Sequence, residues 1–304
     1  MSDIKLIVVD LDGTLLNDEH QVSDRNVDAL KRAIAQGVKV MIATGKTFLS
    51  AKSIIEKLGL TTPGIFVQGL TVYQPDGTLT WQKTLPTDVC RRVITFAEER
   101  GFTIVAYSGT RLLCREISDG IERLSEKYHE PELEVVGPLQ NILFDTQINK
   151  MILVKQNSPK KVTALRWQLE RQLDGEGRLV QAMISDMLEV LPPNVSKGGT
   201  LPMVLKKLDI APEHVLAIGD GENDIEMIKL AGVGVAMGNA DEKLKAVADH
   251  VVSTNQADGV AEAVERFVIK QAELPLAVKE DAKSEPVTPE TKEEVKTEEA
   301  PKEE

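Results

Sequence analysis

The sequence is poor in cysteine. Cys90 and Cys114 are the two cysteines among 304 residues, and their spacing fits no metal-binding motif. A disulfide framework and a cysteine-based metal site are therefore not expected. We predict two reduced thiols without a functional role.

Long apolar runs are also missing. No run approaches the roughly 20 residues needed to span a bilayer, and Met1-Ser2-Asp3 leads into an apolar run without the pattern of a signal peptide. We therefore expect a cytoplasmic protein with no membrane partner. Hydrophobic residues still form 42% of the chain, which is enough for one large domain or two smaller ones.

Positive charge is in short supply. The net charge of −12 argues against a nucleic-acid partner. Half of it lies in residues 271–304, which contain eleven acidic residues, five lysines and no aromatic residue. Such a low-complexity segment cannot bury enough apolar surface to fold, so we predict a disordered acidic tail. It is either a solvating extension or a site for a partner, and the sequence leaves both open.

The chain does contain two apolar runs that end in aspartate. Leu6 to Val9 precede Asp10-Leu11-Asp12-Gly13, and Val215 to Ile218 precede Gly219-Asp220. Runs without polar alternation are typical of central strands in a parallel sheet, and ligands bind at the carboxyl ends of such strands. Along an extended chain Asp10 and Asp12 point to the same side.

The remaining periodicity predicts strands and helices in two blocks with a different module between them. The first block has strands at 5–9, 38–43 and 65–67, helices at 24–36 and 48–58, and a hairpin at 71–85. The middle module has helices at 88–100, 119–128 and 158–173 and strands near 103–107, 111–114 and 151–155, with two short strands before 192 and no confident element at 131–149. The last block has helices at 196–208, 223–231 and 259–269 and strands at 215–219, 233–236 and 251–252. The order predicts an α/β core with a parallel sheet, formed by residues 1–85 and 191–270, and an inserted α+β domain at 86–190.

More polar residues should join Asp10 at this edge of the sheet. Thr44-Gly45 follows the second strand, Lys197 opens the helix after the insertion, and Asn223-Asp224 follows Asp220. Two like charges about 4 Å apart repel by about 4 kcal/mol at an effective dielectric constant of about 20, a cost that a bound divalent cation removes. Oxygen ligands favour Mg²⁺. Lys197 and the Thr44 hydroxyl, with adjacent backbone N–H groups, suit phosphoryl oxygens.

The sequence shows no histidine near these strand ends and no Gly-x-Ser-x-Gly elbow, which leaves a carboxylate or a water as the nucleophile. Taken singly, each residue has a simpler explanation. Asp-Gly is common in turns, Asn223 could cap a helix, and Asp224 could favour the positive end of a helix dipole.

In combination, four segments resemble the motifs of the haloacid dehalogenase superfamily. They read DLDGTLL from Asp10, ATGK around Thr44, SKGGTL around Lys197 and GDGEND around Asp220. Their order and spacing are similar to those of the Cof-type phosphatases, which carry a type IIB cap, and the likeness covers residues 1 to about 270. It implies a Rossmann-like core with an inserted cap domain.

The resemblance also implies roles for individual residues. Asp10 would be the nucleophile, and Asp12 the general acid and then the general base. The carboxylates of Asp10 and Asp220 and the main-chain oxygen of Asp12 would hold Mg²⁺. Phosphate would be bound by Thr44, Gly45 and Lys197, with Asn223 and Asp224 in support.

Two positions depart from the family pattern. Lys46 stands where an arginine is common, and Gln68 stands where an asparagine is common. Both are expected near the substrate entrance, and lysine offers a point charge where arginine offers a planar fork. Lys46 either contacts the substrate or is a solvated lysine at the start of a helix.

The sequence thus predicts a Mg²⁺-dependent phosphatase that hydrolyses a small-molecule phosphate ester, with a sugar phosphate as one candidate, through an aspartyl phosphate. A phosphomutase or phosphotransferase that uses the same intermediate is the first alternative. A non-catalytic sensor or scaffold that binds a partner through the acidic tail is the second. Neither the substrate nor the oligomeric state follows from the sequence.

Overall fold

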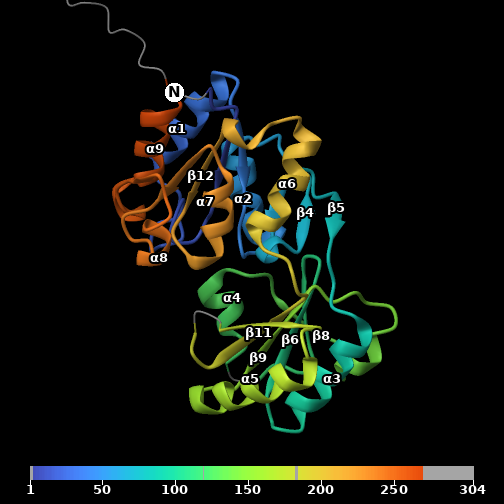
Figure 1. Ribbon diagram of the computed structural model, residues 1–304. Helices are drawn as coiled ribbons and strands as arrows, with labels where there is room; N and C mark the ends of the chain where they lie inside the picture. The colour runs from blue at the N-terminus through green and yellow to red at the C-terminus, as the bar shows by residue number, and fades with distance from the viewer. Residues whose placement is uncertain (1–2, 119, 182–183, 270–304) are drawn as a thin grey trace, which may run out of the picture. The chain divides into compact units, whose positions relative to one another are not determined.

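A five-stranded parallel sheet forms the centre of the fold in the computed structural model, which describes residues 3–118, 120–181 and 184–269 (Figure 1). The predicted acidic tail lies outside the described residues. The strand order is β14-β13-β12-β1-β2, and the strands are β1 (Leu6–Val9), β2 (Lys39–Ile42), β12 (Val215–Gly219), β13 (Val233–Ala236) and β14 (His250–Val251). β1 and β12 are buried along their full length, as inner strands covered on both faces must be. The predicted α/β fold with a parallel sheet is confirmed.

Helices connect and cover these strands. They are α1 (Asp24–Ala35), α2 (Phe48–Leu58), α6 (Lys197–Leu208), α7 (Ile225–Leu230), α8 (Glu242–Lys245) and α9 (Gly259–Phe267). Ser23 starts α1 by accepting a hydrogen bond from the backbone N–H of Asn26 at 3.1 Å, and left-handed Gly59 ends α2. In Figure 1, α1 lies beside α9 and α6 beside α7. In the described part of the chain, every helix is too short or too polar to cross a membrane.

The segment after α2 does not extend the parallel sheet as a full strand. β3 (Gly64–Phe66) pairs antiparallel with β4 (Thr71–Tyr73), which pairs with β5 (Leu79–Gln82) in a separate three-stranded sheet. The link to the central sheet is a single bridge between Ala43 and Ile65. Gln68 and Gly69 have φ values of 60° and 96°, and this left-handed turn sends the chain back along β3. The predicted hairpin is present, whereas the predicted third parallel strand belongs mainly to this small sheet.

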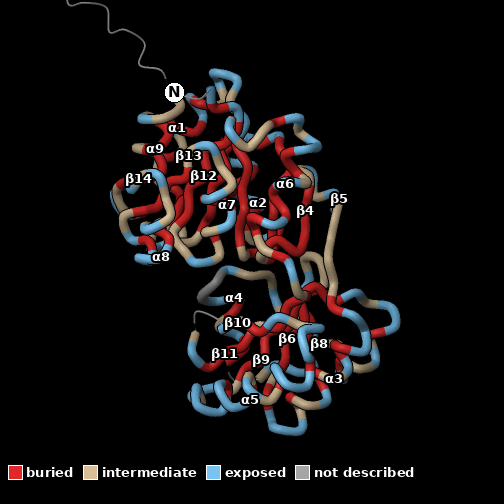
Figure 2. The backbone as a smooth tube through the Cα atoms, viewed as in Figure 1, coloured by how far each residue is buried: buried red, intermediate tan, exposed pale blue. Residues whose placement is uncertain are grey.

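The middle of the chain forms the cap, a six-stranded sheet with helices. The strand order is β10-β11-β9-β6-β7-β8. The elements are α3 (Thr87–Glu98), β6 (Thr103–Ser108), β7 (Arg111–Cys114), α4 (Arg123–Tyr128), β8 (Leu133–Val135), β9 (Lys150–Val154), α5 (Pro159–Leu173), β10 (Arg178–Gln181) and β11 (Met187–Leu191). Figure 2 shows that its central strands are buried and its loops exposed. Residues of α3 and α5 share a core with one face of this sheet.

Two details of the cap differ from the prediction. β8 lies in the segment for which no element is predicted, and it pairs parallel with β7. The helix predicted from residue 119 begins at Arg123, because Gly120 has a φ of 98° that a helix cannot contain.

The places where the chain enters and leaves the cap are tied together. Lys83 Nζ donates to the main-chain oxygen of Pro193 at 2.8 Å. The side-chain amide of buried Asn149 donates to the main-chain oxygen of Lys83 at 3.0 Å and to Gln82 Oε1 at 3.2 Å. The domain boundaries near residues 85 and 191 stay a prediction.

Substitutions at two adjacent glycines at the start of α6 test how closely this helix packs on α7. A Cβ at Gly198 would lie 2.4 Å from the Cβ of Glu226, whereas a Cβ at exposed Gly199 would meet Ser196 Oγ at 3.1 Å as its nearest atom. We expect Gly198→Ala to force the helices apart and lower the free energy of unfolding by about 1–3 kcal/mol. Gly199→Ala should change it by less than about 1 kcal/mol. Urea unfolding of both variants measures the difference, and equal stabilities would contradict the close approach.

Candidate active site

Two aspartates from neighbouring strands meet at the carboxyl edge of the central sheet. Asp10 follows β1 and Asp220 follows β12, and the strands pair with Val9 opposite Ile218. The backbone N–H of Asp10 continues this pairing by donating to the Ile218 oxygen at 3.1 Å. Asp10 is buried, while Asp220 is partly exposed. The sheet therefore brings together the two predicted carboxylates.

A buried lysine lies between Asp10 and a third aspartate. Lys197 Nζ is 2.8 Å from Asp10 Oδ1 and 2.9 Å from Asp224 Oδ1, and the lysine is 1% exposed. Lys197 is the first residue of α6, and Ser196 caps this helix by accepting the backbone N–H of Gly199 at 2.9 Å. Ser196, as the N-cap residue of α6, thus fixes the turn from which the Lys197 side chain extends to Asp10 at the end of β1.

Asp224 also organises the loop after β12. Its Oδ2 accepts the backbone N–H groups of Asp220 and Gly221, both at 3.1 Å. With Oδ1 on Lys197, both oxygens of this fully buried carboxylate already have partners. The neighbouring Asn223 donates from Nδ2 to Gln68 Oε1 at 3.0 Å. Both residues therefore contact parts of the site, and the supporting role expected of them stays a prediction.

Burial and charge shift the pKa values in this cluster. Burial raises the pKa of Asp10 well above its ordinary value, and the attraction of Lys197 only partly opposes this rise. For Lys197, burial acts to lower the pKa, but the attraction of Asp10 and Asp224 outweighs it, so the pKa is raised. Burial, followed by repulsion from Asp224, raises the pKa of Asp220 to about 6. One lysine therefore leaves the three carboxylates with uncompensated negative charge.

This cluster could hold a metal ion. One oxygen from each of Asp10, Asp220 and Asp224 lies within 4.8 Å of the others, and all are of the type that a hard divalent cation prefers. The backbone at Gly13 passes so close that a Cβ there would lie 2.2 Å from Asp220 Oδ2. Thr14 Oγ1 donates to Asp220 Oδ1 at 2.9 Å and orients this carboxylate. The donor set and the tight backbone fit a small cation, and the predicted main-chain ligand at Asp12 stays a prediction.

The Asp12 side chain has different surroundings. Its Oδ1 is 3.3 Å from Lys46 Nζ and 3.2 Å from His20 Nδ1. Lys46 is 5% exposed, so the alternative of a solvated lysine is wrong. The sequence shows no histidine close to the strand ends, but the folded chain places His20 beside Asp12. Asn17 folds residues 17–21 into a turn by accepting the backbone N–H of Gln21 at 2.8 Å, and this turn returns His20 to Asp12.

Thr44 and Gly45 lie in the loop between β2 and α2, beside β3. The backbone N–H of Thr44 donates to the Ile65 oxygen at 2.9 Å, and its hydroxyl accepts from the backbone N–H of Lys46 at 3.2 Å. That hydroxyl still has a proton to donate. A Cβ at Gly45 would lie 2.8 Å from Gln68 Nε2, so this loop and the turn after β3 are in close contact.

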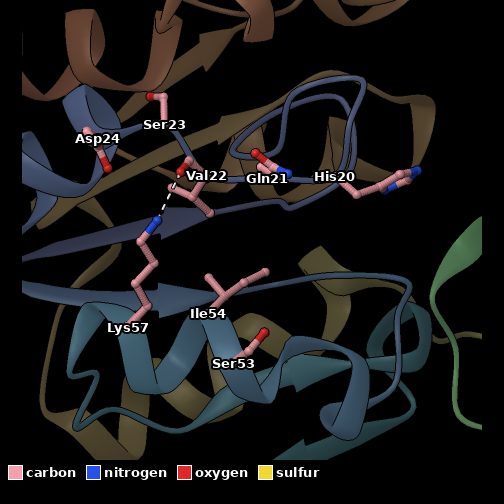
Figure 3. Close-up of a pocket in the computed structure, with 8 residues that line it drawn as sticks. All are labelled: His20, Gln21, Val22, Ser23, Asp24, Ser53, Ile54 and Lys57. Atoms are coloured by element: carbon pink, nitrogen blue, oxygen red, sulfur yellow. Dashed lines mark hydrogen bonds between the residues drawn. The ribbon is translucent and has the colours of Figure 1, made fainter.

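A pocket of about 410 Å³ lies between the turn that carries His20 and helix α2 (Figure 3). Its walls are formed by His20, Gln21, Val22, Ser23, Asp24, Ser53, Ile54 and Lys57. Lys57 Nζ donates to the main-chain oxygen of Val22 at 3.1 Å and joins the two walls. In Figure 3 the His20 ring extends away from the α2 residues, in keeping with its contact to Asp12.

Comparison with known proteins places the chain in a family. Residues 7–264 match the haloacid dehalogenase-like hydrolases. The 5-amino-6-(5-phospho-D-ribitylamino)uracil phosphatase YcsE of Bacillus subtilis is 31% identical over 267 residues, covering 88% of this chain and 97% of the relative. Phosphatase YwpJ of the same organism is 31% identical over 280 residues, covering 85% and 98%.

One relative is much longer than this chain. The chloroplastic protein of Arabidopsis thaliana named endoribonuclease YBEY is 38% identical over 270 residues, which cover 86% of this chain but 46% of the relative. The chain therefore spans about half the length of that protein. The name endoribonuclease refers to the whole of the longer protein.

Solved structures agree with the sequence comparison. A haloacid dehalogenase-like hydrolase from Bacteroides thetaiotaomicron is 29% identical with a TM-score of 0.79, covering 87% of this chain and 99% of its own. A sugar phosphatase of subclass IIB in the same superfamily shares the fold, with a TM-score of 0.74 at 21% identity and coverage of 87% and 100%. Its subclass agrees with the type IIB cap predicted from the sequence. Together with the four motifs, these matches show that the chain belongs to the haloacid dehalogenase-like hydrolases.

Proposed function

We propose that the chain is a Mg²⁺-dependent phosphatase that hydrolyses a small phosphorylated metabolite through an aspartyl phosphate. The carrying observation is the buried contact of Lys197 with Asp10 beside two further carboxylates at the sheet edge. Relatives of almost the same length that are named phosphatases support the reaction class. The proposal includes a cytoplasmic location, where two buried thiols stay reduced.

In the first half-reaction, Asp10 attacks the phosphorus atom. One carboxylate oxygen forms the new bond, while the bond from phosphorus to the leaving oxygen breaks and its electron pair stays on that oxygen. Asp12, in its acid form, gives its proton to the leaving oxygen, so the product is a neutral alcohol. Lys197 neutralises negative charge beside Asp10 and lets the carboxylate approach an anionic group.

In the second half-reaction, water takes the place of the alcohol. Asp12 accepts a proton from the water, whose oxygen bonds to phosphorus as the bond to Asp10 breaks. Inorganic phosphate leaves, and both aspartates return to their starting state. Hydrogen-bond donors at Thr44 and Gly45 would hold phosphoryl oxygens through both steps.

The carboxylates of Asp10 and Asp220 and the main-chain oxygen of Asp12 would hold Mg²⁺. When bound, Mg²⁺ supplies positive charge that screens Asp10 from the phosphate and stabilises the transferring group. One lysine faces three clustered carboxylates at this place, and this excess of negative groups supports a cation here.

An activity assay with a panel of phosphate esters tests the proposed substrate class. The names of relatives suggest its members: 5-amino-6-(5-phospho-D-ribitylamino)uracil, HMP-PP and sugar phosphates. We expect release of inorganic phosphate from at least one alkyl phosphate, abolished by EDTA and restored by Mg²⁺. An isomeric phosphate from a hexose phosphate would instead support a mutase. No turnover with any ester would favour a sensor, and deleting residues 271–304 would then show whether the tail binds a partner.

Replacing the nucleophile tests the covalent route. We expect Asp10→Asn to lower kcat by at least about 10³-fold, because an amide is a poor nucleophile. The amide has nearly the shape of the carboxyl group, and Lys197 keeps its contact with Asp224, so we expect the variant to stay folded at pH 7. Steady-state kinetics and thermal unfolding on the same preparation check both statements. Wild-type rates in a folded variant would show that Asp10 is not the nucleophile.

Replacing Lys197 tests the central ion pairs. Lys197→Met leaves Asp10 and Asp224 buried without their shared cation, so we expect a loss of about 3–5 kcal/mol in the free energy of unfolding. Adding Asp10→Asn to this variant should recover part of that loss, since it removes one buried charge. The control is Lys206→Met, which replaces an exposed lysine of the same helix. If both lysine variants are equally stable in urea, the buried pairs do not stabilise the fold.

A further inference from the structure

Two consecutive cap residues contact the two core segments that carry the partners of Asp12. His129 and Glu130 directly follow α4, where His129 has a left-handed backbone with a φ of 51°. The backbone N–H of Glu130 donates to the oxygen of Leu124 at 3.2 Å, so this segment is fixed to the helix. Its side chains reach the turn that carries His20 and the start of α2.

Glu130 binds the first turn of α2. Its Oε2 accepts the hydroxyls of Thr47 at 2.8 Å and Ser50 at 2.7 Å, and the backbone N–H of Thr47 at 3.4 Å. Thr47 is fully buried and is the N-cap residue of α2. A carboxylate is also favoured there by the helix dipole. Because Lys46 precedes Thr47 directly, this contact holds the segment that carries one partner of Asp12.

His129 contacts the other partner of Asp12. The rings of His129 and His20 meet edge to face, with centroids 4.7 Å apart and planes at 69°. The His20 side chain is 31% exposed and sits on a left-handed residue with a φ of 57°, and its Nδ1 lies 3.2 Å from Asp12 Oδ1. The edge-to-face contact restricts the rotation of this ring.

Asp12 needs such support because its own side chain is 33% exposed. An exposed carboxylate has several rotamers available, and a general acid must lie within hydrogen-bond reach of the leaving oxygen. Two nitrogens, from His20 and Lys46, contact the same oxygen of Asp12. Each of them belongs to a segment that the cap touches at His129 or Glu130.

We propose that His129 and Glu130 are positioning residues that orient Asp12 for proton transfer, His129 through His20 and Glu130 through Thr47 and Lys46. The proposal rests on the acid and base role proposed above for Asp12. It assigns to this part of the cap an indirect effect on the chemical step, through the core residues that contact Asp12.

The leaving group provides a specific test. An alkyl phosphate such as ribose 5-phosphate releases an alkoxide that needs the proton of Asp12, whereas p-nitrophenyl phosphate releases a stable phenolate that needs it little. A change that misplaces Asp12 should therefore lower kcat for the alkyl phosphate much more than kcat for the aryl phosphate. A change that merely destabilises the protein should lower both rates equally.

The variants follow from the contacts. Glu130→Ala removes all three hydrogen bonds, whereas Glu130→Gln keeps an accepting oxygen at the same place. His129→Asn removes the ring but suits the left-handed backbone. We expect Glu130→Ala and His129→Asn each to lower the ratio of alkyl to aryl kcat by about tenfold or more, with Glu130→Gln close to wild type. Glu132→Ala, an exposed acid two residues further on, is the matched control.

Asp12→Asn is the reference variant. Because it removes the proton donor itself, it should lower the ratio of alkyl to aryl kcat the most. If Asp12→Asn lowers both rates equally, the acid role of Asp12 in the proposed function fails. If Asp12→Asn is selective while Glu130→Ala and His129→Asn leave the ratio unchanged, the positioning proposal is overturned and the proposed function stands. Thermal unfolding of each variant checks that it is folded at the assay temperature, so that the kcat values can be compared.

Discussion

The contact of one buried ammonium group with two carboxylates is the interaction on which the site depends. Lys197 joins Asp10 at the end of β1 to Asp224 in the loop after β12, and all three are almost free of solvent. A charge in such surroundings is stable only with its partners present. The lysine therefore fixes the place of α6, and the close approach of Gly198 to α7 makes that place attainable.

Two aspartates separated by one residue have different environments in this chain. Asp10 is buried against a lysine and two further carboxylates, while Asp12 is partly exposed and contacts His20 and Lys46. Different environments are what allow like side chains to take different chemical roles. The separation arises because β1 ends at Val9, so that Asp10 still follows the strand while Asp12 lies in the turn that leads away from it.

The sequence predicts the parts of the fold that depend on periodic burial. The strands before Asp10 and Asp220 and the helix capped by Ser196 follow from apolar runs and capping residues. These elements bring Asp10, Asp220 and Lys197 together. His20 was not predictable in this way, because its place depends on side-chain hydrogen bonds of Asn17 within an irregular turn. The parallel pairing of β8 with β7 was missed for a similar reason, since a three-residue strand has too few positions to show alternation.

The tie between Lys83 and Pro193 has a consequence for how such a protein can evolve. Because the chain leaves the core and returns to it at nearly one point, the covalent connection to the cap constrains the core no more than a short surface loop would. The entropy of closing that loop grows only slowly with its length, so caps of very different size carry similar costs for the core. A different cap could therefore be joined at this point without moving Asp10, Asp220 and Asp224, whereas the contacts that His129 and Glu130 make beside Asp12 would have to be formed anew.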